Sequence, residues 1–191
     1  MPLATKLPHW LSVDEFLAWC PEDNLVWQLV DGEPQAMAPA NRTHGAVQNE
    51  LGALLRNHLV SRGDGCSVVM TPGVVPKVNA SHNMRVPDLA VTCSPYMTEE
   101  AGLSDPVLIV EILSPSNQAE TWANVWTYTT IPSVQEILVV RVVRIGAEVL
   151  RRKADGTWPE EPVSLEGGDL VLHSIGFTVP LAALYRTTRL A

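Results

Sequence analysis

Apolar and polar residues recur along the chain in patterns that predict several helices and strands. The longest helical pattern covers residues 41–62, where one stripe of side chains returns at steps of three and four residues. This stripe consists of His44, Val47, Leu51, Leu54, Leu55 and His58. Gly63 is a typical helix end. A shorter helix is predicted to begin after the hydroxyl cap of Ser12 and to end near Pro21.

Strand patterns lie on both sides of the long helix. Residues 26–30 and 33–37 flank Asp31 and Gly32, a dipeptide typical of a two-residue hairpin turn. Pro34 marks the returning strand as an edge strand because proline donates no N–H. Later in the chain we expect strands over 66–75, 84–93 and 107–113, a helix over 119–130, a strand over 134–143 and a β meander beyond residue 147.

The predicted elements from residue 41 onward follow the order helix, three strands, helix, strand. Strands grouped between helices are typical of an α+β or mixed α/β fold. A chain of 191 residues is long enough for one well-packed domain and short for two. We therefore expect a single domain over 1–191, with a core at about 41–143 between the hairpin and the meander. Apolar residues make up 46% and charged residues 18%, which excludes a disordered chain.

Charge and cysteine content narrow the class of protein. With 21 acidic and 13 basic side chains the net charge is −8, the wrong sign for a protein that coats nucleic acid. No apolar run approaches the roughly 20 residues that cross a bilayer, and the N-terminus lacks a signal-peptide core. We expect a soluble, cytoplasmic protein with no membrane partner. Cys20, Cys66 and Cys93 are odd in number and widely spaced, and we interpret them as buried reduced thiols.

Two carboxylates inside apolar strand patterns are the candidates for chemistry. Asp88 interrupts one such run, and Glu111 lies within another. A buried carboxylate is costly unless it gains a proton, a cation or a hydrogen-bond donor. If the two strands are neighbours, both carboxylates can face one cleft and hold Mg²⁺ or Mn²⁺, which prefer oxygen ligands and activate water toward a phosphate. The alternative to a metal site is structural: Asp88 is then a residue at a strand edge, and Glu111 forms an ion pair with an arginine such as Arg85 or Arg141.

Several further segments stand in a fixed order around these carboxylates. They are LVDGE at 29–33, His44, RVPDLAV at 85–91, VEILSPS at 110–116, YTTIPS at 128–133 and VPLAALY at 179–185. Together they resemble the Uma family, described as "putative restriction endonucleases", within the PD-(D/E)XK nuclease superfamily. The resemblance spans roughly residues 12–186. It implies a restriction-endonuclease-like αβββαβ core and DNA as the substrate.

The resemblance also implies roles for individual residues. Asp88 and Glu111 correspond to metal ligands, with the carbonyl of Ile112 as a third ligand. Glu33 and His44 correspond to residues near the same cleft. His44 lies on the apolar stripe of its predicted helix, so it is expected to point inward. The alternatives are a core or capping histidine at 44 and a solvated hairpin residue at 33.

The sequence departs from the family pattern where a lysine is expected. The superfamily carries lysine two residues after the glutamate, where this chain has Leu113 on the same strand face as Glu111. Members of the Uma family supply a lysine from the next helix, and that position is Asn124 here. Asn124 is therefore a candidate site residue that can hydrogen-bond but carries no charge. Lys77 is the nearest spare cation in the sequence.

Three functional hypotheses follow. The first is a metal-dependent DNA endonuclease, slow because the missing cation is worth roughly 10²–10³ in rate. The second is a catalytically inactive interaction or assembly module of the same fold. The third is an unrelated β-rich binding protein, in which the two carboxylates lie far apart. The resemblance implies a homodimer, for which residues 134–143 and the helix carrying Trp122 and Trp126 are the candidate surface.

Overall fold

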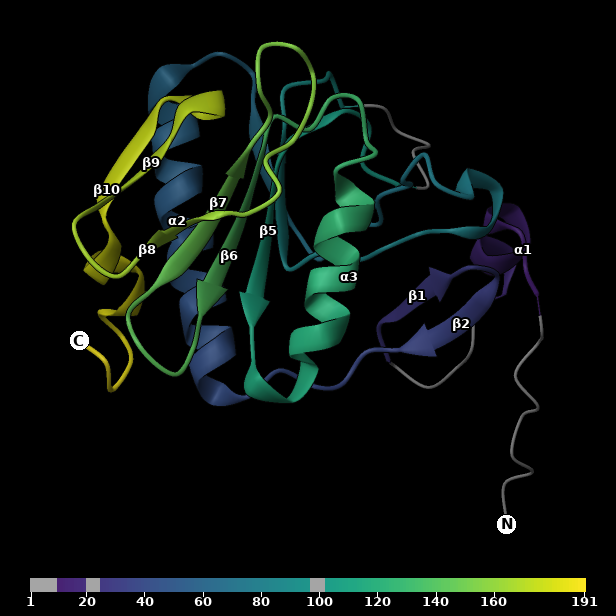
Figure 1. The fold of residues 1–191 in the computed structure, drawn as a ribbon, viewed down its shortest axis with the longest axis horizontal. Coiled ribbons are helices and arrows are strands. Elements are labelled where there is room, and N and C mark those ends of the chain that lie inside the picture. Colours follow the sequence, from purple (N-terminus) through teal and green to yellow (C-terminus); the bar gives the residue numbers. More distant parts are fainter. Residues whose placement is uncertain (1–9, 20–24, 97–101) are drawn as a thin grey trace.

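A six-stranded mixed sheet with one long helix on each face forms the centre of the protein. In the computed structural model, the structure describes residues 10–19, 25–96 and 102–191. The strands follow the order β3-β4-β5-β6-β7-β8 across the sheet. Helix α2 (Arg42–Arg62) lies behind the sheet in Figure 1, and α3 (Gln118–Tyr128) lies in front.

The strand pairing gives the predicted core topology. Neighbouring strands are antiparallel except for β5 and β6, which run parallel and are connected through α3. From α2 to β6 the chain therefore reads αβββαβ, which confirms the predicted order. The strands are β3 (Ser67–Met70), β4 (Leu89–Thr92), β5 (Pro106–Leu113), β6 (Glu136–Arg141), β7 (Ala147–Arg151) and β8 (Val163–Leu165).

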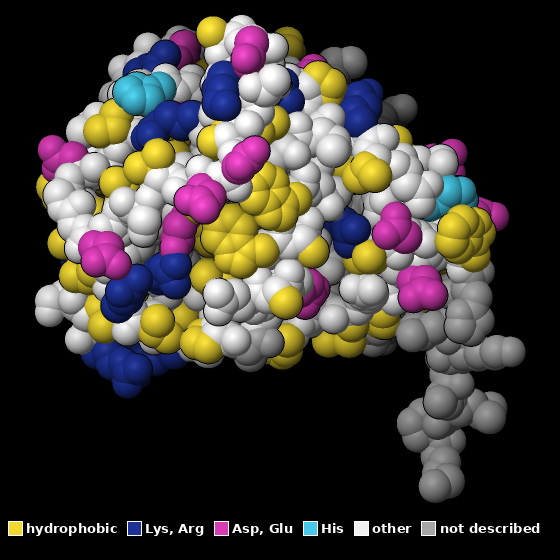
Figure 2. All heavy atoms as spheres, in the orientation of Figure 1, with side chains coloured by type: hydrophobic (Ala, Val, Ile, Leu, Met, Phe, Trp, Pro, Cys, Tyr) yellow, Lys and Arg dark blue, Asp and Glu magenta, His cyan; other side chains and the backbone are white. Residues whose placement is uncertain are grey.

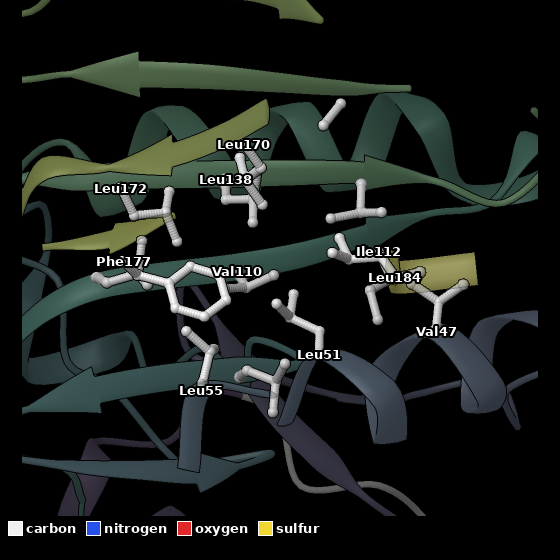
Figure 3. Packing of buried hydrophobic residues seen from close by; sticks show 14 of the residues in the cluster. Val47, Leu51, Leu55, Val110, Ile112, Leu138, Leu170, Leu172, Phe177 and Leu184 are labelled. Atoms are coloured by element: carbon white, nitrogen blue, oxygen red, sulfur yellow. The ribbon is translucent and has the colours of Figure 1, made fainter. Parts of the chain in front are cut away.

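Helix α2 is fixed at both ends by local interactions and along its length by packing. The side chain of Asn41 accepts a hydrogen bond from the N–H of His44 at 3.0 Å, and Gly63 ends the helix with a φ of 67°. Figure 3 shows its buried leucines turned toward the apolar side chains of β5 and β6. The predicted helix over 41–62 is thus confirmed to within one residue.

Smaller elements surround this centre. Helix α1 (Val13–Ala18) begins at Ser12, which exchanges hydrogen bonds with Glu15 in a capping box. Its predicted end near Pro21 lies outside the described residues. The predicted hairpin is present as β1 (Trp27–Val30) and β2 (Glu33–Ala36), joined by a turn with positive φ at Asp31 and Gly32.

The C-terminal part divides between two sheets. Strand β8 extends the central sheet, whereas β9 (Asp169–Leu172) and β10 (Phe177–Pro180) form a separate antiparallel hairpin. Apolar side chains of this hairpin and of the following turn Leu181–Tyr185 complete the core beside α2. Figure 3 labels Leu170, Leu172, Phe177 and Leu184 among them. The predicted meander is therefore part of the core packing and not an appendage.

The strands on either side of residue 80 are shorter than predicted. Ladders form only over Ser67–Met70 and Leu89–Thr92, while the chain between them leaves the sheet and returns through the bridge Val74↔Arg85. Prolines at 72, 76 and 87 explain the difference, because each removes a backbone donor from the pattern.

Strand β6 is a central strand, so it cannot supply the dimer surface suggested by its apolar sequence. It lies between β5 and β7, and residues Glu136–Val140 are all buried. A continuous apolar run is typical of a strand that is covered on both faces, and it is equally typical of a strand at an interface, so the sequence does not distinguish the two. On α3, Trp126 is exposed and Trp122 is partly buried.

The interpretation of the cysteines as buried reduced thiols is wrong for two of them. Cys66 and Cys93 form a disulfide, and Cys93 is exposed. The β3–β4 register pairs Ser67 with Thr92, so the next position on each side places the two cysteines opposite one another. Their separation of 27 residues hides this proximity in the sequence. Cys20 lies outside the described residues.

No helix in the described ranges combines the length and apolar character that a bilayer span requires.

The packing of α2 makes a prediction about stability. Leu51 is fully buried, so Leu51→Ala is expected to lower the free energy of unfolding by about 2–5 kcal/mol, through lost burial and a residual cavity. Val60 on the same helix is 67% exposed, and Val60→Ala is expected to change stability by less than about 0.5 kcal/mol. Urea denaturation of both variants measures the contrast. Equal losses would contradict this packing.

Candidate functional site

The pairing of β4 with β5 brings the two predicted carboxylates onto neighbouring strands. Leu89 lies opposite Val110 in the ladder, and the next position on each strand is Asp88 and Glu111. Opposite residues of an antiparallel pair project from the same face, with closely spaced Cβ atoms. The charge of Asp88 contributes to a raised pKa at Glu111, as expected for carboxylates this close.

Asp88 is held by four hydrogen bonds: two involve its carboxylate, and two reach its backbone carbonyl, one of them from the N–H of Thr71 at 3.0 Å. Its Oδ1 lies 2.7 Å from Nε2 of His44, and its Oδ2 accepts the backbone N–H of Ile112 at 2.7 Å. One turn further along α2, the side-chain amide of Gln48 donates to the carbonyl of Asp88 at 2.9 Å. These contacts fix the carboxylate between the N-terminal half of α2 and the end of β5.

Glu111 is buried beside Asp88 and receives one strong donor. The hydroxyl of Tyr128, the last residue of α3, donates to Oε1 of Glu111 at 2.7 Å. Burial, followed by the charge of Asp88, raises the pKa of Glu111 well above its ordinary value. Burial and then the nearby Glu111 charge also raise the pKa of Tyr128, so its hydroxyl stays protonated as a donor.

Both carboxylates open into one cavity of about 560 Å³, here called the carboxylate cavity. Its lining comes in part from the link between β2 and α2, from the first turns of α2 and from the N-terminal half of α3. Its charged and titratable lining consists of His44, Asp88, Glu111 and Glu120. Among the described residues, no lysine or arginine lines it. The cavity is therefore strongly negative.

Four of the five candidate residues from the sequence lie at this cavity. Asp88, Glu111, His44 and Asn124 all line it, each less than 10% exposed. Glu33 does not: it begins β2 with an exposed side chain and is absent from the lining. Glu33 belongs to the separate two-stranded β1–β2 sheet, and at its position on β2 the side chain is exposed to solvent.

Two residues that stabilise the carboxylates were not selected from the sequence for this purpose. Gln48 follows His44 by four residues, so the helical period alone places both on one face of α2. Tyr128 ends α3, and its contact with Glu111 spans 17 positions of sequence. The helical period of α2 could have identified Gln48 from the sequence. The contact between Tyr128 and Glu111, in contrast, depends on how α3 packs on the sheet.

The alternative of an arginine pair for Glu111 finds no support in the described residues. Arg141 contacts Glu148 of β7. Arg85 is buried and its pKa is lowered by that burial, but it forms no ion pair with Glu111. Within the described residues, Glu111 therefore lies next to a second carboxylate and has no lysine or arginine partner.

Of the three positions considered for a cation, Asn124 lines the carboxylate cavity, whereas positions 113 and 77 lie elsewhere. Leu113 is 5% exposed and packs with Val125 and Tyr128 in the apolar cluster between α3 and the sheet. Lys77 is exposed and lines a different hollow, together with Leu103 and Ile131.

The donor set of the carboxylate cavity suits a hard divalent cation. Within the described residues, no group of three or more histidine, cysteine, aspartate or glutamate side chains is arranged as a metal cluster. Asp88 and Glu111 nevertheless offer adjacent buried oxygens. The carbonyl of Ile112 projects toward β4 as its N–H does, because both groups of one strand residue point to the same side. Oxygen donors favour Mg²⁺ or Mn²⁺, and such an ion would offset the charge of this pair.

The raised pKa of Glu111 predicts how stability depends on pH without metal. The folded protein binds the Glu111 proton more tightly than the unfolded chain does, so this group reduces stability as pH rises above 4.5. Glu111→Gln removes the charge and keeps an oxygen for Tyr128. In EDTA it is expected to raise Tm at pH 8, by about 2–4 °C per kcal/mol of relieved penalty, and to lose this advantage toward pH 4.

Thermal unfolding between pH 4 and pH 8 measures this difference. Glu33→Gln, at an exposed carboxylate outside the carboxylate cavity, serves as the control and is expected to leave Tm unchanged. A difference in Tm between Glu111→Gln and the wild type that does not vary with pH would contradict a raised pKa of Glu111.

Comparison with known proteins agrees with this geometry. The family described as "Uma2: Putative restriction endonuclease" matches residues 13–182. "Uncharacterized protein slr1290" from Synechocystis is 28% identical over 179 residues, which cover 92% of each chain. The fold is similar, with a TM-score of 0.73 and 19% identity, to a crystal structure from Anabaena variabilis described as "a putative nuclease belonging to DUF820", over 92% of this chain and 97% of that one. The chain therefore belongs to the Uma2 family, whose description is "Putative restriction endonuclease", and it has a nuclease-like fold.

Proposed function

We propose that this protein is a metal-dependent endonuclease that hydrolyses phosphodiester bonds in DNA. The observation that carries the proposal is the pair Asp88 and Glu111, buried side by side in a cavity that no described lysine or arginine lines. Two adjacent carboxylates in such a place need a counter-charge, and a divalent cation supplies it with the ligand chemistry present. The family membership supports the same reaction class.

The residues of the cavity have distinct roles in this proposal. Asp88, Glu111 and the carbonyl of Ile112 hold Mg²⁺ or Mn²⁺, which when bound polarises a phosphoryl oxygen and activates water. His44 and the N–H of Ile112 orient the Asp88 carboxylate through its two oxygens. Tyr128 orients Glu111 through Oε1.

The rate is expected to be low because no lysine or arginine among the described residues lines the cavity. Leu113 contributes to the apolar cluster beside α3 and cannot be reached by a phosphate. Asn124 lines the cavity and can orient a phosphate or water by hydrogen bonds, but it adds no charge. Loss of one such electrostatic contribution costs about 10²–10³ in rate.

One other function is favoured by the fact that no described lysine or arginine lines the carboxylate cavity. A chain that retains the fold and has lost the cation can serve as a catalytically inactive interaction or assembly module. A homodimer, implied by the family resemblance, is compatible with either function. The exposed Trp126 on α3 is a candidate contact, since β6 is central in the sheet.

Plasmid nicking tests the endonuclease. The wild-type protein is expected to convert supercoiled DNA to the open circle with Mg²⁺ or Mn²⁺ and not in EDTA. Asp88→Ala and Glu111→Ala are expected to lose this activity while remaining folded, because each removes a metal ligand. Glu33→Gln is the matched carboxylate control and is expected to nick at the wild-type rate. Nicking that persists in either alanine variant would contradict the proposal.

Calorimetric titration with Mn²⁺ separates the two functions. Binding that is lost in Asp88→Ala supports a retained metal site. No binding at millimolar Mn²⁺, together with no nicking, supports the inactive module.

Restoring a cation predicts a gain of activity. Asn124→Lys places an ammonium group at the lining of the carboxylate cavity and is expected to raise the nicking rate by about 10²–10³. Asn124→Gln, which adds length without charge, is the control and is expected to stay near the wild-type rate. A folded Asn124→Lys protein with no faster nicking in Mg²⁺ would contradict the role given to the missing cation.

A further inference from the structure

A second hollow, of about 640 Å³, has the opposite charge from the carboxylate cavity. Two arginines line it, Arg42 at the start of α2 and Arg189 near the C-terminus, together with Thr43 and Thr187. Thr188 also lines it, but its hydroxyl donates to the carbonyl of Tyr185 and accepts the N–H of Leu190. No described aspartate or glutamate lines it. We call it the arginine hollow. A positive hollow is unexpected on a protein of net charge −8.

The two arginines also differ from the other solvent-accessible arginines in having no partner. Five of these others contact carboxylates: Arg62, Arg141, Arg144, Arg151 and Arg186. Arg152 donates to backbone carbonyls, and Arg56 donates to Asn57. Within the described residues, the side chains of Arg42 and Arg189 form no hydrogen bond or ion pair, and both side chains are exposed. Both guanidinium groups are therefore available to one ligand in one hollow.

The start of α2 adds to the positive potential of the arginine hollow. This helix is 21 residues long and has no acidic residue in its first turn, so the partial positive charge of its N-terminus is not offset locally. Asn41 caps only the N–H of His44 with its side chain. Guanidinium groups, hydroxyls and a helix N-terminus together favour a phosphate group.

The position of the arginine hollow indicates which phosphate it takes. Asn41 lines both the arginine hollow and the carboxylate cavity, and the neighbours Ser114 and Pro115 line one each. The two sites therefore adjoin across the start of α2. Figure 2 shows dark blue side chains at the lower left, close to where Figure 1 places the C-terminal end of the chain.

We propose that the arginine hollow is a phosphodiester-binding subsite, which holds a backbone phosphate of the DNA strand whose scissile phosphate lies at Asp88 and Glu111. The inference rests on the proposed function, since that function supplies the strand. It explains how an acidic protein can hold a polyanion: two arginines without an acidic neighbour in the hollow supply a local positive potential beside the proposed reaction site.

Oligonucleotide binding without metal tests this subsite. Fluorescence anisotropy in EDTA measures the Kd of labelled single-stranded and duplex DNA over a range of salt concentrations. The double variant Arg42→Gln/Arg189→Gln is expected to bind about 10-fold or more weakly, with a salt slope smaller by about 0.7 per arginine for single strands and 0.9 for duplex. Arg42→Lys/Arg189→Lys is expected to recover much of the affinity.

The matched control is Arg56→Gln on the same helix. Arg56 is also exposed, but it lies about 21 Å along the axis from Arg42 at 1.5 Å per residue. The Arg56→Gln protein is expected to bind DNA with the affinity of the wild type. Equal weakening by Arg56→Gln, wild-type affinity in the double glutamine variant, or no DNA binding by the wild type at low salt would each overturn the subsite.

Competition separates the two sources of a phosphate group. Inorganic phosphate or a mononucleotide that binds in an arginine-dependent manner, when oligonucleotides do not, would overturn the DNA assignment in favour of a free phosphate ligand. Arginine-dependent oligonucleotide binding by a protein that never nicks DNA would support the subsite and contradict the endonuclease. The two proposals therefore fail separately.

Discussion

The proximity of two buried carboxylates is the constraint around which the candidate site is arranged. Asp88 immediately precedes β4 and Glu111 lies within β5, each one position beyond the Leu89–Val110 pair, where apolar side chains cover both faces of the sheet. Burial, and after it the neighbouring charge of Asp88, disfavours ionisation and raises the pKa of Glu111. The fold offsets part of this cost with His44, Tyr128 and the N–H of Ile112. These donors orient the oxygens but leave the net negative charge for a cation to balance.

The distribution of charge around α2 extends this arrangement. His44 and Gln48 on one side of the helix contact Asp88, while Arg42 at its start lines a hollow without acidic groups. One helix thus separates a negative cavity from a positive one. If a nucleic-acid strand crosses the start of α2 as proposed, the arginine hollow supplies a local attraction, so a net charge of −8 is compatible with a DNA substrate.

Local patterns in the sequence predicted most elements but not their neighbours. The helical period gave α2, and the Asp31-Gly32 turn gave the β1–β2 hairpin, because both depend on residues close in sequence. The Cys66–Cys93 disulfide and the central position of β6 were misread, since each depends on strand pairing. Glu33 resembled a site residue by its motif, yet its strand turns it to solvent.

The sequence by itself determined the order of the elements, the residue types available for metal chemistry and the absence of lysine at Leu113 and Asn124. These properties follow from composition, periodicity and order along the chain. Only the tertiary structure decided that Asp88 and Glu111 are adjacent, that Tyr128 and Gln48 stabilise them, and that Arg42 and Arg189 share a hollow. The physical reason is that contacts between distant segments depend on strand register and helix packing, and no local pattern specifies either.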